Sequence, residues 1–346
     1  MGDNNNLSLF AKKVLIILGL TALSMLFAGV LFYALDFLLL LFAAILLAVI
    51  FRHFGLWISD FFNIPENYAT GLGIVLIFGI VFLFFFFGVS IVRNQISEFM
   101  RIFPASLNKL MQFLSQYEIV SRNIENFSQR DLIQNTQMLI GKSTLFLTSF
   151  FGVVSSIFIA IIIAVFLAVS PEPYLNGFLS LVPNSQKGRA RDILNKMATS
   201  LNGWITGTFV DMALVAVLTT AGLLILQVPM AIFLGLFAGA VTFIPTIGPI
   251  IGAVPSILVG FAQSPQKALY ITILYVVVQV VESNFMMPFV MRRTLQLPPA
   301  LILVTQVLFG ILAGFLGLAL AVPILTSLIV LIKELYIKDV IQKRKM

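Results

Sequence analysis

Long apolar runs recur along the whole 346-residue chain. Several reach the roughly 20 residues that an α-helix needs to cross about 30 Å of hydrocarbon. Only 10% of the residues are charged, whereas 60% are hydrophobic. An ordinary soluble domain carries roughly 25% charged residues and could not hide this much apolar surface in one core. The sequence therefore predicts an all-α polytopic integral membrane protein whose surroundings are the lipid bilayer.

The formal net charge of +7 could indicate nucleic-acid binding, but the basic residues do not form one patch. They lie in short clusters between the apolar runs: Lys12 and Lys13, Arg52, Lys187 to Arg191, Arg292 and Arg293, and Lys333 to Lys345. This spacing is typical of a topology signal, since cationic loops stay on the cytoplasmic side of a membrane. We predict no nucleic-acid partner, and we place both termini in the cytoplasm.

The apolar pattern divides the chain into five parts. We expect a transmembrane scaffold at 1–92, an amphipathic polar helical region at 93–142, a fourth span and cytoplasmic connector at 143–202, a core with two helical hairpins at 203–332, and a basic cytoplasmic tail at 333–346. The polar region shows apolar residues at helical spacing, such as Ile96, Phe99 and Phe103. This pattern indicates helices that lie on the membrane or cover a neighbouring subunit, or a small cap without chemistry.

The C-terminal half contains the most informative pattern. Spans at about 203–226 and 268–290 are each followed by a long apolar segment, at about 229–262 and 299–332. Both segments exceed one straight crossing and are interrupted by Pro and Gly, which predicts broken helices or re-entrant hairpins. With the N-terminal spans, the expected fold has about six full spans plus these two hairpins.

The two halves of this core also resemble each other. The octapeptides that begin at Gln227 and Gln296 align at an offset of 69 (296 minus 227), and the same offset places Gly248 on Gly317 and Pro245 on Gly314. Each unit is one span plus a hairpin, so the two copies would have opposite orientation. An inverted repeat built around broken helices is typical of transporters.

Broken helices create candidate binding groups. A proline removes its own N–H and leaves a carbonyl without its partner, and glycine permits the turn that follows. At membrane depth such groups must face protein, water or a ligand. The candidate site is therefore Thr242, Pro245, Thr246, Gly248, Pro249 and Gly252, facing Gly314 and Gly317.

Two acidic residues, Asp211 and Glu282, lie inside apolar runs, where a charged side chain is rare and costs about 2.5–3.5 kcal/mol on insertion scales. Gln279 lies one turn before Glu282, and Asn284 is close by. We expect Glu282 to bind a coupling proton, a cation or the solute, because a carboxyl removed from water can exchange protons near neutral pH. The alternative places both acids at hydrated helix ends.

Signals for an enzyme are weak. The chain has one histidine, His53, and no cysteine, so neither a zinc site nor thiolate chemistry is expected. The sequence lacks the H-E-x-x-H and G-x-S-x-G motifs. We predict no enzyme activity, no catalytic residues, no metal and no cofactor.

Three stretches in the C-terminal half carry a family resemblance: Phe-Ile-Pro-Thr-Ile-Gly-Pro-Ile-Ile-Gly-Ala-Val-Pro at 243–255, Gln-Val-Val-Glu-Ser-Asn at 279–284 with Pro288 after it, and a Gly- and Ala-rich stretch at 310–323. They resemble the AI-2E (autoinducer-2 exporter) transporter family, over essentially the whole chain. The resemblance implies a bacterial inner-membrane protein; some members export autoinducer-2 and others are implicated in Na⁺(Li⁺)/H⁺ antiport. The matching positions are Pro245, Gly248, Pro249, Gly252, Pro255, Glu282, Asn284 and Pro288. At Gly207-Thr208 the chain departs from the Gly-Gln that many members have, which leaves the ligand on that side open.

The function expected from these features is secondary transport of a small polar solute, with binding at the broken-helix tips and alternating access. The resemblance adds an autoinducer-2-like signal as one candidate solute. One alternative is a monovalent cation/proton antiporter that uses Asp211 and Glu282. Another is a non-transporting membrane scaffold with 93–142 as its partner surface. We also expect a homo-oligomer.

Overall fold

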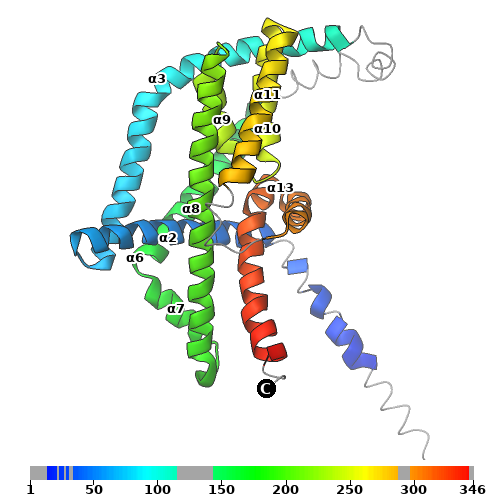
Figure 1. The fold of residues 1–346 in the computed structure, drawn as a ribbon. Coiled ribbons are helices and arrows are strands. Elements are labelled where there is room, and N and C mark those ends of the chain that lie inside the picture. The colour runs from blue at the N-terminus through cyan, green and yellow to red at the C-terminus, as the bar shows by residue number, and fades with distance from the viewer. Residues whose placement is uncertain are drawn as a thin grey trace, which may run out of the picture.

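The computed structural model describes residues 14–21, 23–26, 29–30, 34–114, 143–286 and 297–342. Within these residues every regular element is a helix and no strand occurs, so the predicted all-α fold is confirmed there (Figure 1). The predictions that rest on Lys12, Lys13, Arg292 or Arg293, on 115–142 and on 343–346 fall outside this part of the chain.

Helices α2 (Leu35–Phe62), α3 (Glu66–Leu114) and α6 (Ser143–Val169) form the N-terminal part of the fold. Asn63 follows the last residue of α2 and has left-handed backbone angles. A residue in this conformation commonly terminates a helix. Alanines four residues apart line the contact of α2 with α6, because small residues let helix backbones approach closely in lipid. They are Ala44, Ala48, Ala160, Ala164 and Ala168.

Helix α7 (Pro171–Ser180) follows α6 after a bend of 87°. Pro171 lacks the N–H that would continue α6 and fits the first position of a new helix. The short 3₁₀ turn η1 (Asn184–Gln186) then leads into α8 (Lys187–Ile225), a helix of 39 residues. The bend therefore turns the chain from α6 towards the start of the longest helix of the C-terminal half.

Two helices are longer than the sequence pattern suggested. Helix α3 continues past residue 93 to Leu114, and α8 joins most of the expected connector to the expected span at 203. Polar residues such as Arg, Gln and Glu are good helix formers, so the change from apolar to polar side chains at these places does not end the helix. Hydrophobicity alone therefore misplaced both helix boundaries.

The C-terminal half contains both expected interruptions. Helices α9 (Ala231–Val241) and α10 (Gly248–Gln263) are separated by residues 242–247. Helix α13 (Pro299–Leu331) loses helical angles at Ala313 and Gly314, and its two halves run in different directions (Figure 1). Between α10 and α13 along the chain lie α11 (Pro265–Val281) and the π-helical turn η2 (Glu282–Met286). A second π-helical stretch, η4 (Ile332–Gln342), follows α13.

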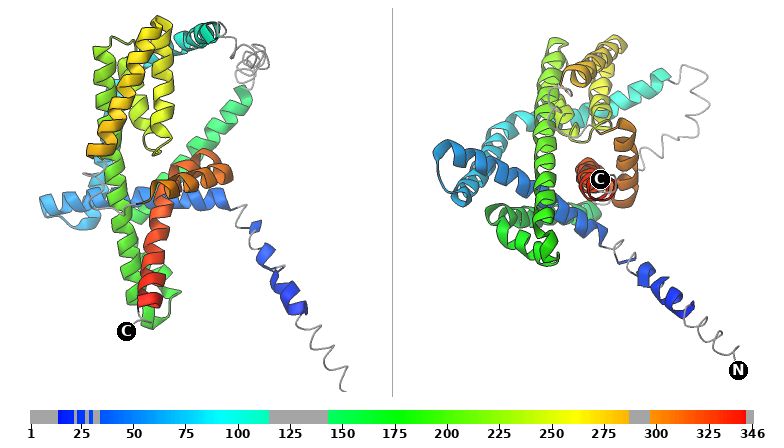
Figure 2. Two further views of the ribbon diagram at one scale, coloured as in Figure 1. Left: turned by 45° about the vertical axis from the view of Figure 1, so that its right-hand side comes forward. Right: turned by 60° about the horizontal axis from the view of Figure 1, so that its bottom comes forward.

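Helix α8 contributes to three hydrophobic clusters, of which two are large enough to be called cores. The first joins α2, α8 and the second half of α13 through Leu39, Leu201 and Leu320. The second joins the end of α8 to α9, α10 and α11 through Leu223, Leu234, Val259 and Ile271. Both views of Figure 2 show α9, α10 and α11 beside one half of α8 and the end of α13 beside the other half. Helix α8 is therefore the axis that connects the two cores.

The described residues contain fewer candidate membrane spans than the six expected for the whole chain. Within the described residues, four helices are long and apolar enough to cross a membrane, or up to five if the bent pair α6 and α7 counts as one span. Helix α11 has only 17 residues before the π-helical turn begins, which is short for a crossing. The apolar run at 14–35, the first of the expected scaffold at 1–92, is described only in part, and 287–290 lie outside the described residues.

The second half of α3 packs on the α9–α10 pair of the same chain. The rings of Phe99 and Phe233 are in tilted contact, with centroids 5.4 Å apart. The side-chain Oε1 of Gln95 accepts a hydrogen bond from the backbone N–H of Phe233 (2.9 Å), and Lys109 donates to the carbonyl of Ala262 (2.9 Å). Helix α3 thus satisfies backbone groups that α9 exposes at its start and α10 at its end.

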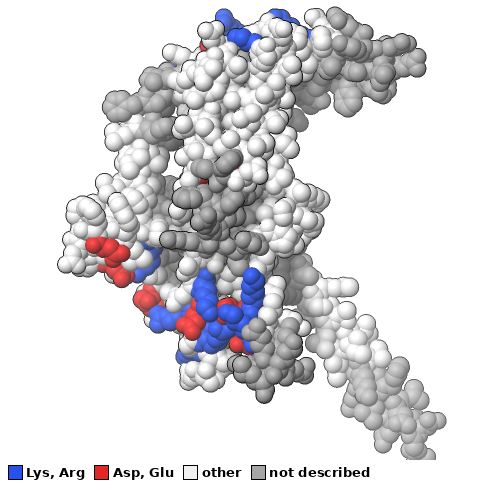
Figure 3. Space-filling view, in the orientation of Figure 1, with Lys and Arg blue, Asp and Glu red and all other residues white. Residues whose placement is uncertain are grey.

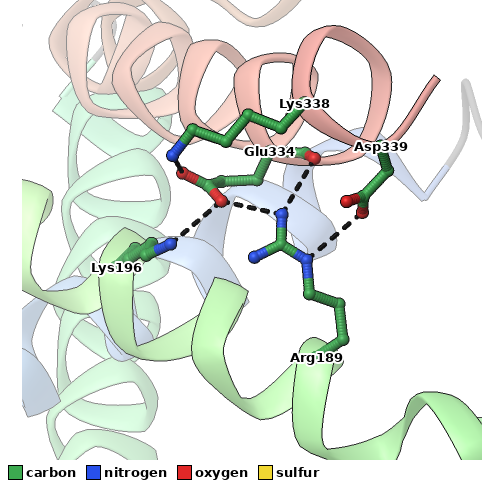
Figure 4. A network of polar contacts seen from close by, with 5 residues as sticks. All are labelled: Arg189, Lys196, Glu334, Lys338 and Asp339. Atoms are coloured by element: carbon green, nitrogen blue, oxygen red, sulfur yellow. Dashed lines mark hydrogen bonds and ion pairs between the residues drawn. The ribbon is translucent and has the colours of Figure 1, made fainter. Parts of the chain in front are cut away.

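Most of the charged residues visible in Figure 3 gather towards the lower end of the molecule, below a broad and largely uncharged face, and a smaller group of Lys and Arg lies at the top. At the lower end the side chain of Glu334 is only 8% exposed and accepts from three cations of α8 and η4 (Figure 4). The distances are 2.8 Å from Arg189 Nη2, 2.9 Å from Lys196 Nζ and 2.6 Å from Lys338 Nζ. Arg189 also pairs with Asp339 at 3.2 Å. This network fastens η4 to the start of α8.

Replacing Gln95 by Leu should lower the free energy of unfolding by about 1 kcal/mol, because the start of α9 loses a side-chain acceptor. Urea unfolding of the purified protein in detergent measures this change. Ser97→Ala is the matched control, since the Ser97 hydroxyl donates only to Asn94 of its own helix. Equal losses in both variants would show that Gln95 has no capping role.

Replacing Glu334 by Gln should lower the thermal unfolding midpoint, because three cations then share a neutral acceptor. The difference from wild type should shrink as salt is added, since salt screens the pairs that reach solvent. Glu172→Gln serves as the control, because Glu172 is an exposed partner of Arg191. A midpoint for Glu334→Gln that matches the control at all salt concentrations would contradict this role.

Candidate functional site

A cavity of about 450 Å³ lies between the two hydrophobic cores, beside the middle of α8. Its volume falls in the range of about 300–1,000 Å³ that is usual for small-molecule sites. The lining comes from α8, from the break between α9 and α10, from the region of η2 and from α13. The residues are Trp204, Gly207, Thr208, Asp211, Thr242, Pro245, Thr246, Ile250, Gln279, Glu282, Ser283, Leu297, Pro299, Ile302 and Val322.

Helical spacing explains how these elements supply their polar groups. The lining residues of α8 are at positions 204, 207, 208 and 211, which share one face of a helix. Gln279, Glu282 and Ser283 have the same spacing at the end of α11 and the start of η2. Two helical faces with polar residues therefore meet across the cavity, and the interrupted backbone at 242–247 closes it.

Two carboxyl groups, Asp211 and Glu282, line this one cavity. Glu282 is 8% exposed and accepts a hydrogen bond from Gln279 Nε2 at 3.2 Å. Asp211 Oδ1 is buried and has no hydrogen-bond partner among the described residues. The described lining residues include no Lys, Arg or His. A bound proton or cation would therefore supply the charge that this part of the site lacks.

The described residues contain no group of three or more His, Cys, Asp or Glu side chains suited to a metal ion. Two carboxyls with amide and hydroxyl neighbours instead offer oxygen atoms to a proton, a monovalent cation or the donors of a polar solute. The groups present are therefore chemically suited to binding a small ligand.

Trp204 was not predicted as a site residue. Its side chain is 2% exposed, packs edge-on against Phe243 at 5.8 Å between ring centroids, and has an indole N–H without a partner among the described residues. The sequence did contain a signal, because Trp204 lies seven residues before Asp211 and so shares its helix face. Trp204 links the α8 face to the break that carries Phe243.

Six of the twelve predicted site residues line the cavity: Thr242, Pro245, Thr246, Asp211, Gln279 and Glu282. The other six do not, namely Gly248, Pro249, Gly252, Asn284, Gly314 and Gly317. Asn284 donates to the carbonyl of Val280 in its own helical segment. Three of the glycines serve close packing instead: a Cβ at Gly248 would overlap the carbonyl of Val241, one at Gly252 would meet Ala238, and one at Gly317 would overlap the carbonyl of Phe309. Gly314 has open space around it and a φ of 59°, so it serves the turn of the backbone.

Tyr275 fixes the position of α10 against α11. Its hydroxyl lies 2.8 Å from the Ser256 hydroxyl and donates to the carbonyl of Gly252 at 3.0 Å. Ser256 is fully buried, so this is an interior polar contact and not a surface one. It sets the distance between α10, which carries Ile250, and α11, which leads into Glu282.

Comparison with known proteins matches residues 20–337 to the family described as AI-2E family transporter. The chain is 30% identical over 201 residues to "Putative transport protein YueF" of Bacillus subtilis (strain 168). This alignment covers 57% of this chain and 54% of that protein. It is 24% identical over 328 residues to "AI-2 transport protein TqsA" of Escherichia coli (strain K12), which covers 92% and 91%.

A third relative, "Putative transport protein YrrI" of Bacillus subtilis (strain 168), is 32% identical over 143 residues, or 41% of this chain and 40% of that protein. The chain thus spans about half the length of YueF and YrrI, whereas it spans nearly all of TqsA. The family match extends over more than half of the chain and includes every residue that lines the cavity. This protein belongs to the AI-2E family of transporters.

Proposed function

We propose that this protein is a secondary transporter that binds a small polar solute or cation in the cavity between α8, residues 242–247 and η2. A transport role in the membrane follows from the family; the location of the site is our inference. The observation that carries it is the convergence of Asp211, Glu282 and an interrupted backbone on one cavity. Broken helices beside intramembrane carboxyls are how transporters expose binding groups at membrane depth.

The repeat that we expect in the core would support alternating access as the mechanism. Adding 69 to Pro245 gives Gly314, which is one of the two residues where α13 loses helical angles. Gly248 and Gly317 also have matching surroundings, because a Cβ at either would overlap a carbonyl near the end of the preceding half-helix, that of Val241 or Phe309. We propose that the two broken segments are inverted copies and that their movement opens the cavity to each side in turn.

The orientation that we propose places the charged end of Figure 3 in the cytoplasm. Arg189, Lys196 and Lys338 lie there, and cationic segments stay on the cytoplasmic side. The N- and C-termini would then be cytoplasmic in a bacterial inner membrane. We also propose a homo-oligomer, because a chain with this many exposed apolar and small residues has further surface for helix contacts in lipid.

For the solute we propose two candidates. TqsA is named an AI-2 transport protein, which makes export of an autoinducer-2-like signal the first. A sodium or lithium/proton antiport is the second, and the unpartnered Oδ1 of Asp211 favours it. The sequence offers no nucleotide site, so an ion gradient or the solute's own gradient would drive the flux. A non-transporting scaffold is less well supported, because α3 covers helices of its own chain with part of the segment such a scaffold would use.

The test measures internal pH in liposomes that contain the purified protein, with sodium, lithium or autoinducer-2 added outside in turn. Glu282→Gln should reduce the response at sub-saturating solute by about tenfold or more, since hydrogen bonds to charged groups contribute about 1.5–3 kcal/mol. A response to autoinducer-2 would favour signal export, whereas a response to sodium or lithium would favour antiport. If none of them changes the internal pH, uptake of labelled autoinducer-2 tests uncoupled export.

Asp211→Asn should also reduce the internal pH response. Glu172→Gln should transport like wild type, because Glu172 lies at the charged end and is exposed. Circular dichroism and size-exclusion profiles of all variants check that they are folded. Wild-type flux in both folded Asp211→Asn and folded Glu282→Gln would refute the proposed site.

A further inference from the structure

The carbonyl of Pro245 is an unusual backbone group. Its helical partner would be the N–H of residue 249, but that residue is Pro249, which has none. Two other donors take its place. The backbone N–H of Ile247 donates to it at 2.8 Å, and Gln306 Nε2, from the first half of α13, donates at 2.8 Å.

The hydrogen bond from Ile247 to Pro245 closes a three-residue turn centred on Thr246. Thr246 has φ of 70°, in a region that β-branched residues rarely adopt. A turn with an i to i+2 hydrogen bond and positive φ at its centre is a rare and strained γ-turn. Strained backbone of this kind persists only where its surroundings hold it, and Gln306 is the side chain that reaches it.

Gln306 itself is costly to bury. Its side chain is fully buried, and its Oε1 has no hydrogen-bond partner among the described residues. The neighbouring Thr305 is also buried, but its hydroxyl donates within its own helix, to Leu301 at 2.7 Å. The amide of Gln306 therefore connects α13 to the break between α9 and α10, and Thr305 does not.

We propose that Gln306 is a positioning residue that holds the strained turn at 245–247 and couples the two broken segments of the core. Through this turn it places Thr242, Pro245 and Thr246 on the wall of the cavity. Because this amide joins the first half of α13 to the break between α9 and α10, a displacement of either segment must carry the other with it or break this bond. The link between turn and transport rests on the proposed function; the mechanical role of Gln306 does not.

The test uses Ile250, which lies three residues after the turn, lines the cavity and is 66% exposed. Since the chain has no cysteine, Ile250→Cys introduces the single thiol of the full-length protein. Its rate of alkylation by N-ethylmaleimide in proteoliposomes reports how firmly the turn holds the start of α10. The rate is measured with Gln306 intact and with Gln306→Met, Gln306→Asn or Thr305→Val added.

Gln306→Met should raise the alkylation rate by about fivefold or more, which is the effect of losing one buried hydrogen bond on a local equilibrium. Gln306→Asn is too short to reach the carbonyl and should act in the same direction, which covers the case in which the Met variant does not fold. Thr305→Val removes a buried hydroxyl from the same turn of α13 and should leave the rate near that of the Ile250→Cys parent.

A second substitution distinguishes support of the turn from general packing. Thr246→Gly accepts positive φ without strain, so adding it to Gln306→Met should return the alkylation rate towards that of the parent. A packing defect at Gln306 would not be rescued by glycine at position 246. The proposal is overturned if folded Gln306→Met and Gln306→Asn alkylate at the parental rate, or if Thr246→Gly restores nothing. Neither of these alkylation measurements uses a transported solute, so their result is independent of the liposome transport test.

Discussion

Backbone N–H and C=O groups within a bilayer have no water to bond, so every interruption of a helix needs a partner inside the protein. This constraint explains the non-local polar contacts of the C-terminal half. The start of α9 is capped by Gln95, the end of α10 by Lys109, and the orphan carbonyl of Pro245 by Gln306. Each donor or acceptor belongs to another helix than the one whose backbone it caps, so the breaks are stable only when α3, α9, α10 and α13 are assembled.

The same constraint gives α3 its role. An amphipathic helix on a membrane surface would leave Gln95 and Lys109 in water, whereas here both reach backbone groups of the α9–α10 pair. Phe99 and Phe113 add ring contacts with Phe233 and Phe261. Helix α3 therefore contacts both helices of the α9–α10 pair. These bonds do not involve the interruption at 242–247.

Much of the fold could be predicted from the sequence, since apolar runs and clustered Pro and Gly determine where helices lie in lipid and where they break. The break at Gly314 lies in the long apolar segment at 299–332, where the sequence predicted an interruption by Pro and Gly. Helix ends in polar sequence could not be predicted, because Arg, Gln and Glu continue a helix as well as apolar residues do. The uninterrupted course of α3 past 93 and of α8 through 203 shows this.

The residues of the candidate site could be predicted where the residue type is rare in an apolar run. They could not be predicted where their role depends on packing. Asp211 and Glu282 stand out because carboxyls in apolar runs are costly. Trp204 and Gln306 do not, since an indole or an amide is ordinary in sequence and becomes informative only once its burial and its partners are known. The six predicted residues that do not line the cavity are mostly glycines and prolines; their effect is on the path of the backbone.

The electrostatics of the cavity suggest why binding and movement would be linked under the proposed function. Asp211 belongs to α8, the axis shared by both cores, whereas Glu282 begins the turn after α11. Two like charges in one weakly polar cavity repel unless a proton or cation lies with them. An occupied site thus permits α8 and η2 to approach, and an empty one favours their separation. Since a ligand shifts an equilibrium only by its differential affinity for the two states, these carboxyls give an ion the means to select one arrangement of the core.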